Sequence, residues 1–177
     1  MQIVVMGVAG AGKTTIGQRL AQRHGWAFID ADDLHPSTNI AKMQSGIALD
    51  DADRAPWLAR LRQVLADYEA RRSICVLACS ALKPAYRAEL RVNDQVKFVY
   101  LKLNIDQAMQ RVAQRSEHFM PRSLVASQFA TLVEPNDALI VAATDEPAMI
   151  VEQIERWLKP QMARNEPFVG EKREEKV

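Results

Sequence analysis

The sequence has little of several features that would point away from a globular enzyme. Among its 177 residues, Lys and Arg number 23 and Asp and Glu number 22, which gives a net charge of +1. This balance argues against a protein that grips nucleic acid mainly by neutralising phosphates. No run of 18 apolar residues occurs, so we expect no transmembrane helix. The first apolar stretch lacks a preceding basic region and leads straight to Lys13, so we expect no signal peptide.

Cysteine and histidine are also scarce. The two cysteines, Cys75 and Cys79, lie in one apolar segment that is typical of a strand. Four strand residues separate their Cα atoms by about 13 Å, whereas a disulfide allows about 7 Å. We therefore predict that both are reduced core residues of a cytoplasmic protein. The three histidines (His24, His35 and His118) lack the spacing of zinc ligands, which argues against a structural zinc site.

The composition itself is that of a folded domain, with 48% hydrophobic and 25% charged residues. A chain of this length buries roughly 70% of its unfolded surface, so its core needs neither a disulfide nor a metal. We predict a single domain over residues 1–160 and a polar, flexible C-terminal tail over 161–177.

Apolar runs of β type alternate with helical patterns along the chain. Each run is hydrophobic at nearly every position, which is typical of strands buried on both faces of a parallel sheet. Gly25 is expected to end the first helix and Pro160 the last one. The alternation predicts an α/β fold of three layers with right-handed crossovers. The predicted strands are 2–6, 26–30, 74–79, 96–103 and 138–143, and the predicted helices are 13–24, 53–71, 105–115 and 147–158.

Residues 7–14 match the phosphate-loop pattern G-x-x-x-x-G-K-[ST] completely, between a predicted strand and a predicted helix. Glycines let successive backbone N–H groups point into one concavity, and the helix N-terminus adds its positive dipole. Lys13 is predicted to reach the β- and γ-phosphates and Thr14 to ligate Mg²⁺. The alternative is a glycine-rich turn with a chance lysine. The predicted nucleotide-binding residues here are Gly7, Val8, Ala9, Gly10, Ala11, Gly12, Lys13, Thr14 and Thr15.

The phosphate loop is compatible with three classes of nucleotide-binding protein: small-molecule kinases, GTPase switches, and motor or AAA-type ATPases. The sequence has no Asn-Lys-x-Asp segment for guanine, and the strand at 74–79 does not end in paired acidic residues. The acidic residues come earlier, as Asp30, Asp32 and Asp33. Asp30 and Asp32 are two apart at a strand end, so we expect both to point toward the ligand crevice. We predict that Asp30 serves the magnesium ion, Asp32 a substrate hydroxyl, and Asp33 the cap of the next helix.

Further motifs follow in order along the chain. They are the phosphate loop, Asp30-Ala31-Asp32-Asp33-Leu34-His35-Pro36, Asn39 with Lys42-Met43 and Gly46, residues 51–58 (DADRAPWL), residues 79–83 (CSALK) with Tyr86-Arg87, Arg111 with Arg115, His118-Phe119, and Gln128 before Glu134-Pro135. Over residues 3–158 this set resembles the gluconokinases, a family of P-loop small-molecule kinases related to shikimate kinase and adenylate kinase.

The resemblance implies a five-stranded parallel sheet of order 2-3-1-4-5, flanked by helices, with a small lid at about 111–125. It implies that ATP phosphorylates D-gluconate at its terminal hydroxyl to give 6-phospho-D-gluconate. It also implies a homodimer. The balanced charge and the lack of a long apolar run predict neither nucleic acid nor a membrane as a partner.

A gluconate pocket needs a cation for the carboxylate and polar partners for a row of hydroxyls. We predict Arg54, Lys83 and Arg87 as the cations, and His35 and Asp32 as partners of hydroxyls. The alternative for each is a solvated side chain.

Arg111 and Arg115 lie four residues apart, on one face of a predicted helix. We predict that both bind the nucleotide and that Arg115 closes over the phosphates during transfer. An exposed basic helix end is the alternative. With Lys13 and Asp32, Arg115 completes the predicted catalytic set.

Two other functions remain open. One is another polyol or acid kinase, such as a shikimate-kinase-like enzyme. The other is a regulatory nucleotide-binding protein that kept the fold and lost transfer, although a pure binder has no need for Lys13, Asp32 and the lid arginines together.

Overall fold

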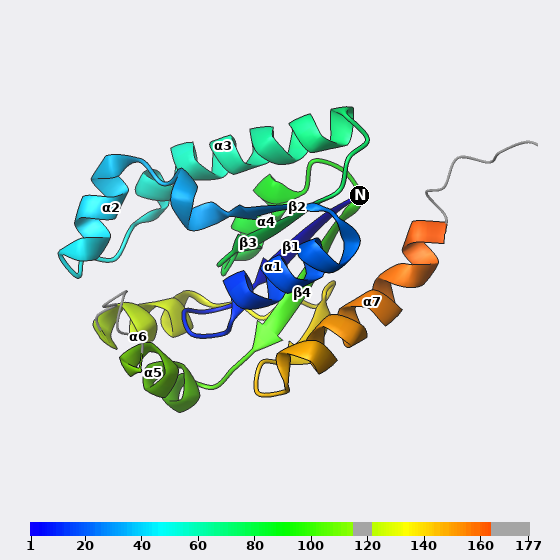
Figure 1. Ribbon diagram of the computed structural model, residues 1–177. Helices are drawn as coiled ribbons and strands as arrows, with labels where there is room; N and C mark the ends of the chain where they lie inside the picture. Colours follow the sequence, from blue (N-terminus) through cyan, green and yellow to red (C-terminus); the bar gives the residue numbers. More distant parts are fainter. Residues whose placement is uncertain (115–121, 164–177) are drawn as a thin grey trace, which may run out of the picture.

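Five parallel strands form the middle layer of the protein, in the order β2-β3-β1-β4-β5 (Figure 1). The computed structural model describes residues 1–114 and 122–163. Both the α/β class and the strand order are as predicted. The elements are β1 (Gln2–Met6), α1 (Lys13–His24), β2 (Ala27–Asp30), the 3₁₀ helix η1 (Ala31–Leu34), α2 (Ser37–Gln44), α3 (Asp51–Ala70), β3 (Cys75–Cys79), α4 (Pro84–Leu90), β4 (Val96–Lys102), α5 (Ile105–Ala113), α6 (Arg122–Thr131), β5 (Leu139–Ala142) and α7 (Pro147–Ala163).

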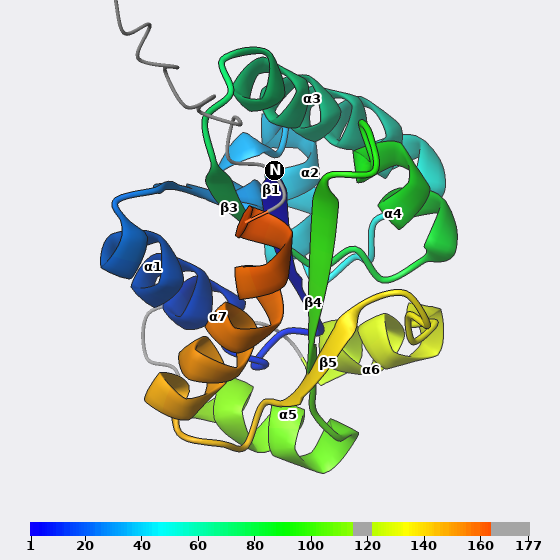
Figure 2. The ribbon, with the colours of Figure 1, turned by 90° about the vertical axis from the view of Figure 1, so that its right-hand side faces the viewer.

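The central strand β1 is buried at all five positions because its apolar side chains pack into two separate hydrophobic cores. Ile3 and Val5 belong to one core, with apolar residues of α1 and α7. Val4 and Met6 belong to the other, with residues of α3 and α4. Figure 2 shows these helix pairs on opposite sides of the sheet. The continuous hydrophobicity of the strand follows from this burial on both faces.

The two cysteines are free and buried in β3, as predicted. Burial raises the pKa of both Cys75 and Cys79 to about 12, so both thiols stay protonated at neutral pH. Among the described residues, no helix is both long and apolar enough to cross a membrane.

The end of α1 and the start of α3 are set by local capping residues rather than by the spacing of apolar residues. Gly25 stops α1 in the left-handed conformation (φ 66°), as predicted. α3 begins at Asp51, two residues earlier than predicted, because Asp50 and Asp53 form a reciprocal capping box with each other's backbone N–H groups.

The prediction that Pro160 ends the last helix is wrong, because α7 continues to Ala163. Proline removes one backbone donor from the helix. The side-chain amide of Gln161 donates to the carbonyl of Trp157 at 3.0 Å and so supplies a further donor to this turn. Met162 packs on the same core as the earlier turns of α7, which gives the helix an apolar contact beyond the proline.

The carboxyl ends of the strands share one edge of the sheet, as they must when all strands are parallel. The phosphate loop follows β1, η1 follows β2, and residues 80–83 follow β3. Figure 1 shows α2 on one side of this edge and α5 and α6 on the other.

Candidate active site

The phosphate loop wraps the start of α1. Gly12 is the residue before the helix, at φ 91°, and a Cβ added there would meet no atom within 4 Å. Gly10, at φ 82°, lies against α5, where an added Cβ would come within 3.1 Å of the Ala108 carbonyl oxygen. The loop therefore packs closely on α5 but stays open in front of the helix N-terminus, where an anion is stabilised. Lys13 is half-buried, and its Nζ donates to the Val8 carbonyl at 3.1 Å.

Thr14 and Asp30 meet directly at the end of β2. The Thr14 hydroxyl donates to Asp30 Oδ2 at 2.8 Å, and both groups face solvent. Thr15, the next residue of α1, is also exposed. The pair therefore presents one hydroxyl and one carboxylate beside the helix N-terminus, which are oxygen groups of the kind Mg²⁺ prefers.

Asp32 does not continue the strand, so the prediction that it and Asp30 point the same way from one strand is wrong. β2 ends at Asp30, and the backbone turns into η1. Asp30 is itself the cap of η1, since its Oδ1 accepts from the Asp32 N–H at 3.1 Å. The expected capping role of Asp33 is therefore also wrong. The Asp32 side chain is exposed and not engaged by this cap.

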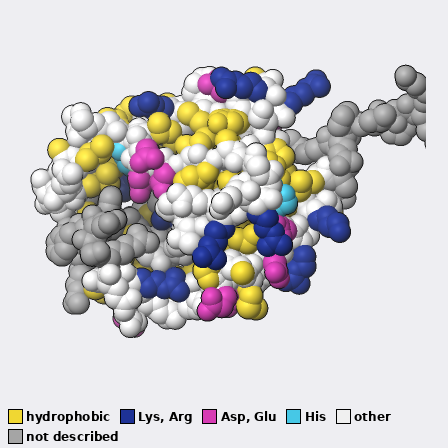
Figure 3. Space-filling view, viewed as in Figure 1, with side chains coloured by type: hydrophobic (Ala, Val, Ile, Leu, Met, Phe, Trp, Pro, Cys, Tyr) yellow, Lys and Arg dark blue, Asp and Glu magenta, His cyan; other side chains and the backbone are white. Residues whose placement is uncertain are grey.

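His35 lies between acidic and basic groups. Burial lowers the pKa of its imidazole, the negative charge of Asp32 raises it, and the positive charge of Arg54 lowers it. In Figure 3 acidic side chains gather beside a histidine, in the region where Figure 1 places the segment between β2 and α2. The structure thus brings three predicted substrate residues, Asp32, His35 and Arg54, into one neighbourhood.

Arg54 and Lys83 both border the ring of Tyr86, at 5.6 Å and 5.5 Å from its centre. Lys83 Nζ donates to both carboxylate oxygens of Asp51, at 2.7 Å and 2.8 Å. The Tyr86 hydroxyl donates to the same carboxylate, and Arg54 Nη1 lies 3.3 Å from that hydroxyl. Hydrogen bonding to Lys83 and Tyr86 lowers the pKa of Asp51, and Asp51 raises the pKa of Lys83. We refer to Asp51, Arg54, Lys83 and Tyr86 as the cation cluster.

Asp51 and Tyr86 were not predicted as site residues, although both lie inside the motifs quoted above. Asp51 is the first residue of α3, and Tyr86 is the third residue of α4. Only the fold brings these two residues of α3 and α4 to the two cations.

Arg87 does not share this neighbourhood. Its side chain is 7% exposed, and its Nη1 donates to the carbonyls of Ala81, Leu82 and Val133 at 3.1 Å to 3.2 Å. Ala81 has a positive φ of 44°, an unfavourable conformation for a residue with a Cβ. Arg87 thus stabilises the strained turn that leads to Lys83. These contacts give it a structural role and do not support the predicted contact with substrate.

The phosphate loop is also held by the two helices that flank the predicted lid. Arg111, at the end of α5, donates to the Gly10 carbonyl at 3.3 Å and to the Ala143 carbonyl at 2.8 Å. Gln128 of α6 accepts from the Ala9 N–H at 2.7 Å. Arg111 therefore lies next to the phosphate loop, and its binding to the nucleotide stays a prediction. Arg115 and residues 116–121 of the predicted lid lie outside the described residues.

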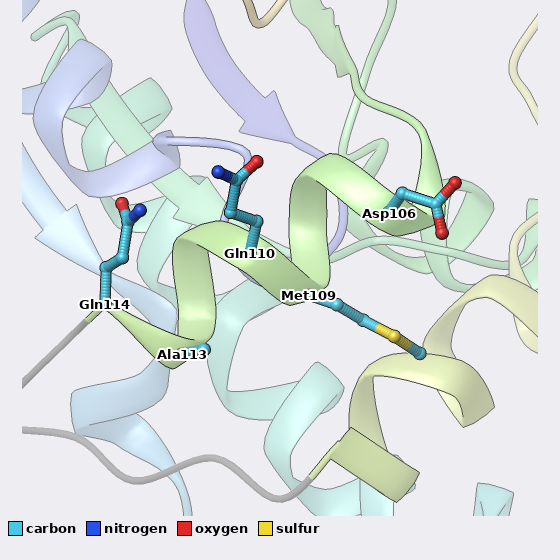
Figure 4. A pocket seen from close by; sticks show the side chains of 5 residues that line it. All are labelled: Asp106, Met109, Gln110, Ala113 and Gln114. Carbon is cyan, nitrogen blue, oxygen red and sulfur yellow. The ribbon is translucent and has the colours of Figure 1, made fainter.

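A cavity of about 460 Å³ lies along α5, lined by Asp106, Met109, Gln110, Ala113 and Gln114. Figure 4 shows Met109 leaving the helix on a different side from Gln110 and Gln114. None of these residues belongs to the phosphate loop or the cation cluster, so we do not place the chemistry in this cavity.

Comparison with known proteins shows the family of the chain. A family model described as shikimate kinase matches residues 9–159. The gluconokinase of Gluconobacter oxydans is 43% identical over 158 residues, which cover 87% of this chain and 89% of that protein. The thermoresistant gluconokinase of Escherichia coli is 40% identical, covering 78% of this chain and 82% of its own length. The chain belongs to the gluconokinase family.

Solved structures resemble the chain to different degrees. The crystal structure of a gluconokinase from Sinorhizobium meliloti has a TM-score of 0.82 at 38% identity, covering 93% of this chain and 97% of that one. The shikimate kinase of Aquifex aeolicus has a TM-score of 0.55 at 16% identity, covering 92% and 99%. The shikimate kinase therefore shares the fold alone. As a member of the gluconokinase family, the protein is an ATP-dependent kinase.

Proposed function

We propose that the protein transfers the γ-phosphoryl group of ATP to the terminal hydroxyl of D-gluconate, giving 6-phospho-D-gluconate and ADP. The observation that carries the proposal is a continuous row of polar groups. It begins at the phosphate loop, passes Asp32 and His35, and ends at the cation cluster. A row with hydroxyl partners in the middle and cations at one end matches an open-chain sugar acid.

The phosphate loop binds the triphosphate through its backbone N–H groups, and Lys13 stabilises charge on the transferring group. Arg111 joins this loop to the loop after β5, so it fixes one wall of the nucleotide site. Arg115 is proposed to close over the phosphates and neutralise charge.

A magnesium ion fits beside Thr14 and Asp30. A hydroxyl and a carboxylate oxygen are hard ligands, and phosphate oxygens and water complete the usual six positions. Residues 1–114 and 122–163 hold no cluster of three or more His, Cys, Asp or Glu side chains that could hold a metal ion. When bound, Mg²⁺ would neutralise charge on the β- and γ-phosphates.

Asp32 is the proposed partner of the reacting hydroxyl. The hydroxyl oxygen forms a bond to the γ-phosphorus while the bond from that phosphorus to the bridging oxygen of ADP breaks. Because this transition state is loose, the hydroxyl loses its proton late, and the Asp32 carboxylate accepts it.

The cation cluster is the proposed site for the gluconate carboxylate. Lys83 is already paired with the Asp51 carboxylate. A substrate carboxylate would therefore share Lys83 with Asp51 or displace it, while Arg54 offers a planar group for two hydrogen bonds. The distance between this cluster and Asp32 then selects the hydroxyl at the far end of the chain.

ADP release should be measured with Mg-ATP and a panel of D-gluconate, related sugar acids and the uncharged polyol glucitol. The proposal expects gluconate to be preferred and glucitol to react poorly. Lys83→Met should reduce turnover of gluconate more than turnover of glucitol, because only gluconate carries the carboxylate. Equal losses of turnover with gluconate and with glucitol would show that the substrate carboxylate does not bind at the cation cluster. Lys97→Met, which changes a half-buried lysine of β4 outside the cation cluster, is the matched control.

We also propose a cytoplasmic homodimer. Ile140 on the edge strand β5 is 48% exposed and Val133 is 50% exposed, which leaves apolar surface at this side of the sheet. Light scattering coupled to size-exclusion chromatography should give a mass near twice that of the chain. A mass of one chain at micromolar concentration would contradict the dimer.

A further inference from the structure

The His35 ring is fixed in its plane by aromatic stacking. It lies parallel to the indole of Trp57, with ring centres 4.2 Å apart and an angle of 12° between planes. Trp57 is 2% exposed, and its Nε1 donates to the Ala31 carbonyl at 2.7 Å. The stacking partner is therefore itself anchored by burial and a hydrogen bond, and the His35 ring lies parallel to it.

Asn39 of α2 is a buried polar residue, with 2% of its surface exposed. Its amide nitrogen donates to the Asp53 backbone carbonyl at 2.8 Å. A backbone carbonyl can only accept, so this contact decides which end of the side-chain amide is nitrogen. The same nitrogen lies 3.3 Å from Nδ1 of His35.

An amide nitrogen donates and does not accept, so His35 Nδ1 must be the acceptor in this contact. A neutral imidazole with an accepting Nδ1 carries its proton on Nε2. The second ring nitrogen is therefore a hydrogen-bond donor. Protonation of Nδ1 would place two donors against each other and break the contact with Asn39.

We propose that Asn39 is a positioning residue, which holds His35 in the neutral tautomer that offers Nε2–H to a hydroxyl oxygen of the substrate. This inference rests on the proposed function, since it assumes a polyol in front of His35. It gives the site a donor of fixed direction without adding another positive charge beside the cation cluster.

The surrounding charges agree with a neutral ring. Burial is the largest effect on the pKa of His35 and lowers it below 6.5, followed by opposing effects of Asp32 from η1 and Arg54 from α3. On α2, Lys42 is paired with the carboxylate of Asp53 at 2.6 Å. The protonated ring appears only below the lowered pKa. Gluconate KM is therefore expected to rise as the pH falls through that value, while the KM for ATP changes little.

The first test needs no variant and no substrate. Long-range ¹H–¹⁵N NMR correlations of the imidazole nitrogens distinguish a protonated from a bare nitrogen. At pH 7 the His35 Nδ1 is expected to be bare and Nε2 protonated. A ring with its proton on Nδ1, or a doubly protonated ring, would overturn the proposal whatever the substrate is.

The second test is Asn39→Asp, which replaces the donor by an acceptor of the same shape. The new carboxylate favours a proton on Nδ1, so the His35 pKa should rise and the acid limb of kcat/KM for gluconate should move to higher pH. Gluconate KM should increase about tenfold, with kcat and the KM for ATP near their original values. Gln44→Glu, on an exposed position of the same helix, is the matched control for added charge.

An Asn39→Asp protein that only loses thermal stability, with an unchanged pH profile, would show that Asn39 acts on structure alone and would overturn the proposal. If the variant does not fold, the NMR measurement on the unchanged protein still decides. If the NMR result is as expected but gluconate is not phosphorylated, the proposed function fails and the tautomer assignment stands.

Discussion

Asp30 and Asp32 are separated by one residue and make different contacts. Asp30 is occupied by the Thr14 hydroxyl and by the N–H at the start of η1. Asp32 is exposed beyond that turn. One carboxylate is thus fixed beside the nucleotide loop, and the other remains available to a substrate.

Removing each charge while keeping the shape should separate the two roles. Asp32→Asn is expected to lower kcat by about 10² to 10⁴ with nucleotide binding little changed, because it loses the proton acceptor. Asp30→Asn should instead raise the Mg²⁺ concentration needed for half activity. Titrations with Mg²⁺, ATP and gluconate measure both effects, and Asp33→Asn is the neighbouring control. Rescue of Asp32→Asn, but not Asp30→Asn, by excess Mg²⁺ would mean that the roles are reversed.

Lys13 gives a second prediction at this scale. Lys13→Ala removes a cation from the transferring phosphoryl group, so kcat should fall about 100-fold or more. The circular dichroism spectrum should be unchanged, since the side chain contacts the loop rather than the core. Lys97→Ala should keep its turnover. A folded Lys13→Ala protein with near-normal turnover would refute the assignment.

Among the elements, α4 shows that a motif residue can serve the fold. Arg87 connects α4 to the turn before Lys83 and to the segment after α6 through three carbonyls. Arg91, one turn later, makes an exposed ion pair with Asp137. The two arginines therefore offer a comparison between a buried cation of α4 and a half-buried cation at the C-cap of the same helix.

Arg87→Met should lower the free energy of unfolding by about 2 to 3 kcal/mol, because buried carbonyls lose their donor. Arg91→Met should cost less, about 1 to 2 kcal/mol, because it loses a partly exposed ion pair and the contact of Arg91 with the Phe98 ring at 5.0 Å, but leaves no buried carbonyl without a donor. Chemical denaturation measures both. A stable Arg87→Met protein that no longer binds gluconate would contradict this structural role. It would support the contact between Arg87 and substrate that the sequence predicts.

The strands and the longer helices could be predicted from the sequence because burial on both faces leaves a continuous apolar run, and Gly25 marks a helix end by itself. The short elements η1, α2, α4 and α6 escaped prediction. α2 buries only Asn39, so it carries almost no apolar periodicity. α4 has seven residues, too few for a periodic pattern to stand out.

The candidate site could likewise be predicted only in part from the sequence. The phosphate loop is contiguous, so its residues could be named from the sequence together with the backbone geometry they need. The cation cluster joins α3 to α4 across 32 residues, and the role of Asp51 depends on that contact. The turn from β2 into η1 could not be read from the Asp-Ala-Asp-Asp run, since a continued strand and a 3₁₀ turn fit it equally well.

At the scale of the whole molecule, the strand order brings three separate sequence segments to one edge. β1 lies between β3 and β4, and β2 lies beyond β3. The phosphate loop after β1 therefore lies beside the turn that follows β3 and leads to Lys83. η1, which follows β2, lies beyond that turn.

The central claim is that this edge holds an open-chain sugar acid. The most direct measurement follows ADP release with D-gluconate and with shikimate under the same conditions, and assigns the phosphorylated carbon of the product by ³¹P and ¹³C NMR. We predict turnover with gluconate, phosphate on its terminal carbon, and poor turnover with shikimate, because a ring leaves buried polar groups unpaired in a site built for a chain. Shikimate turnover equal to or above that of gluconate, or phosphate on any other carbon of gluconate, would contradict the account.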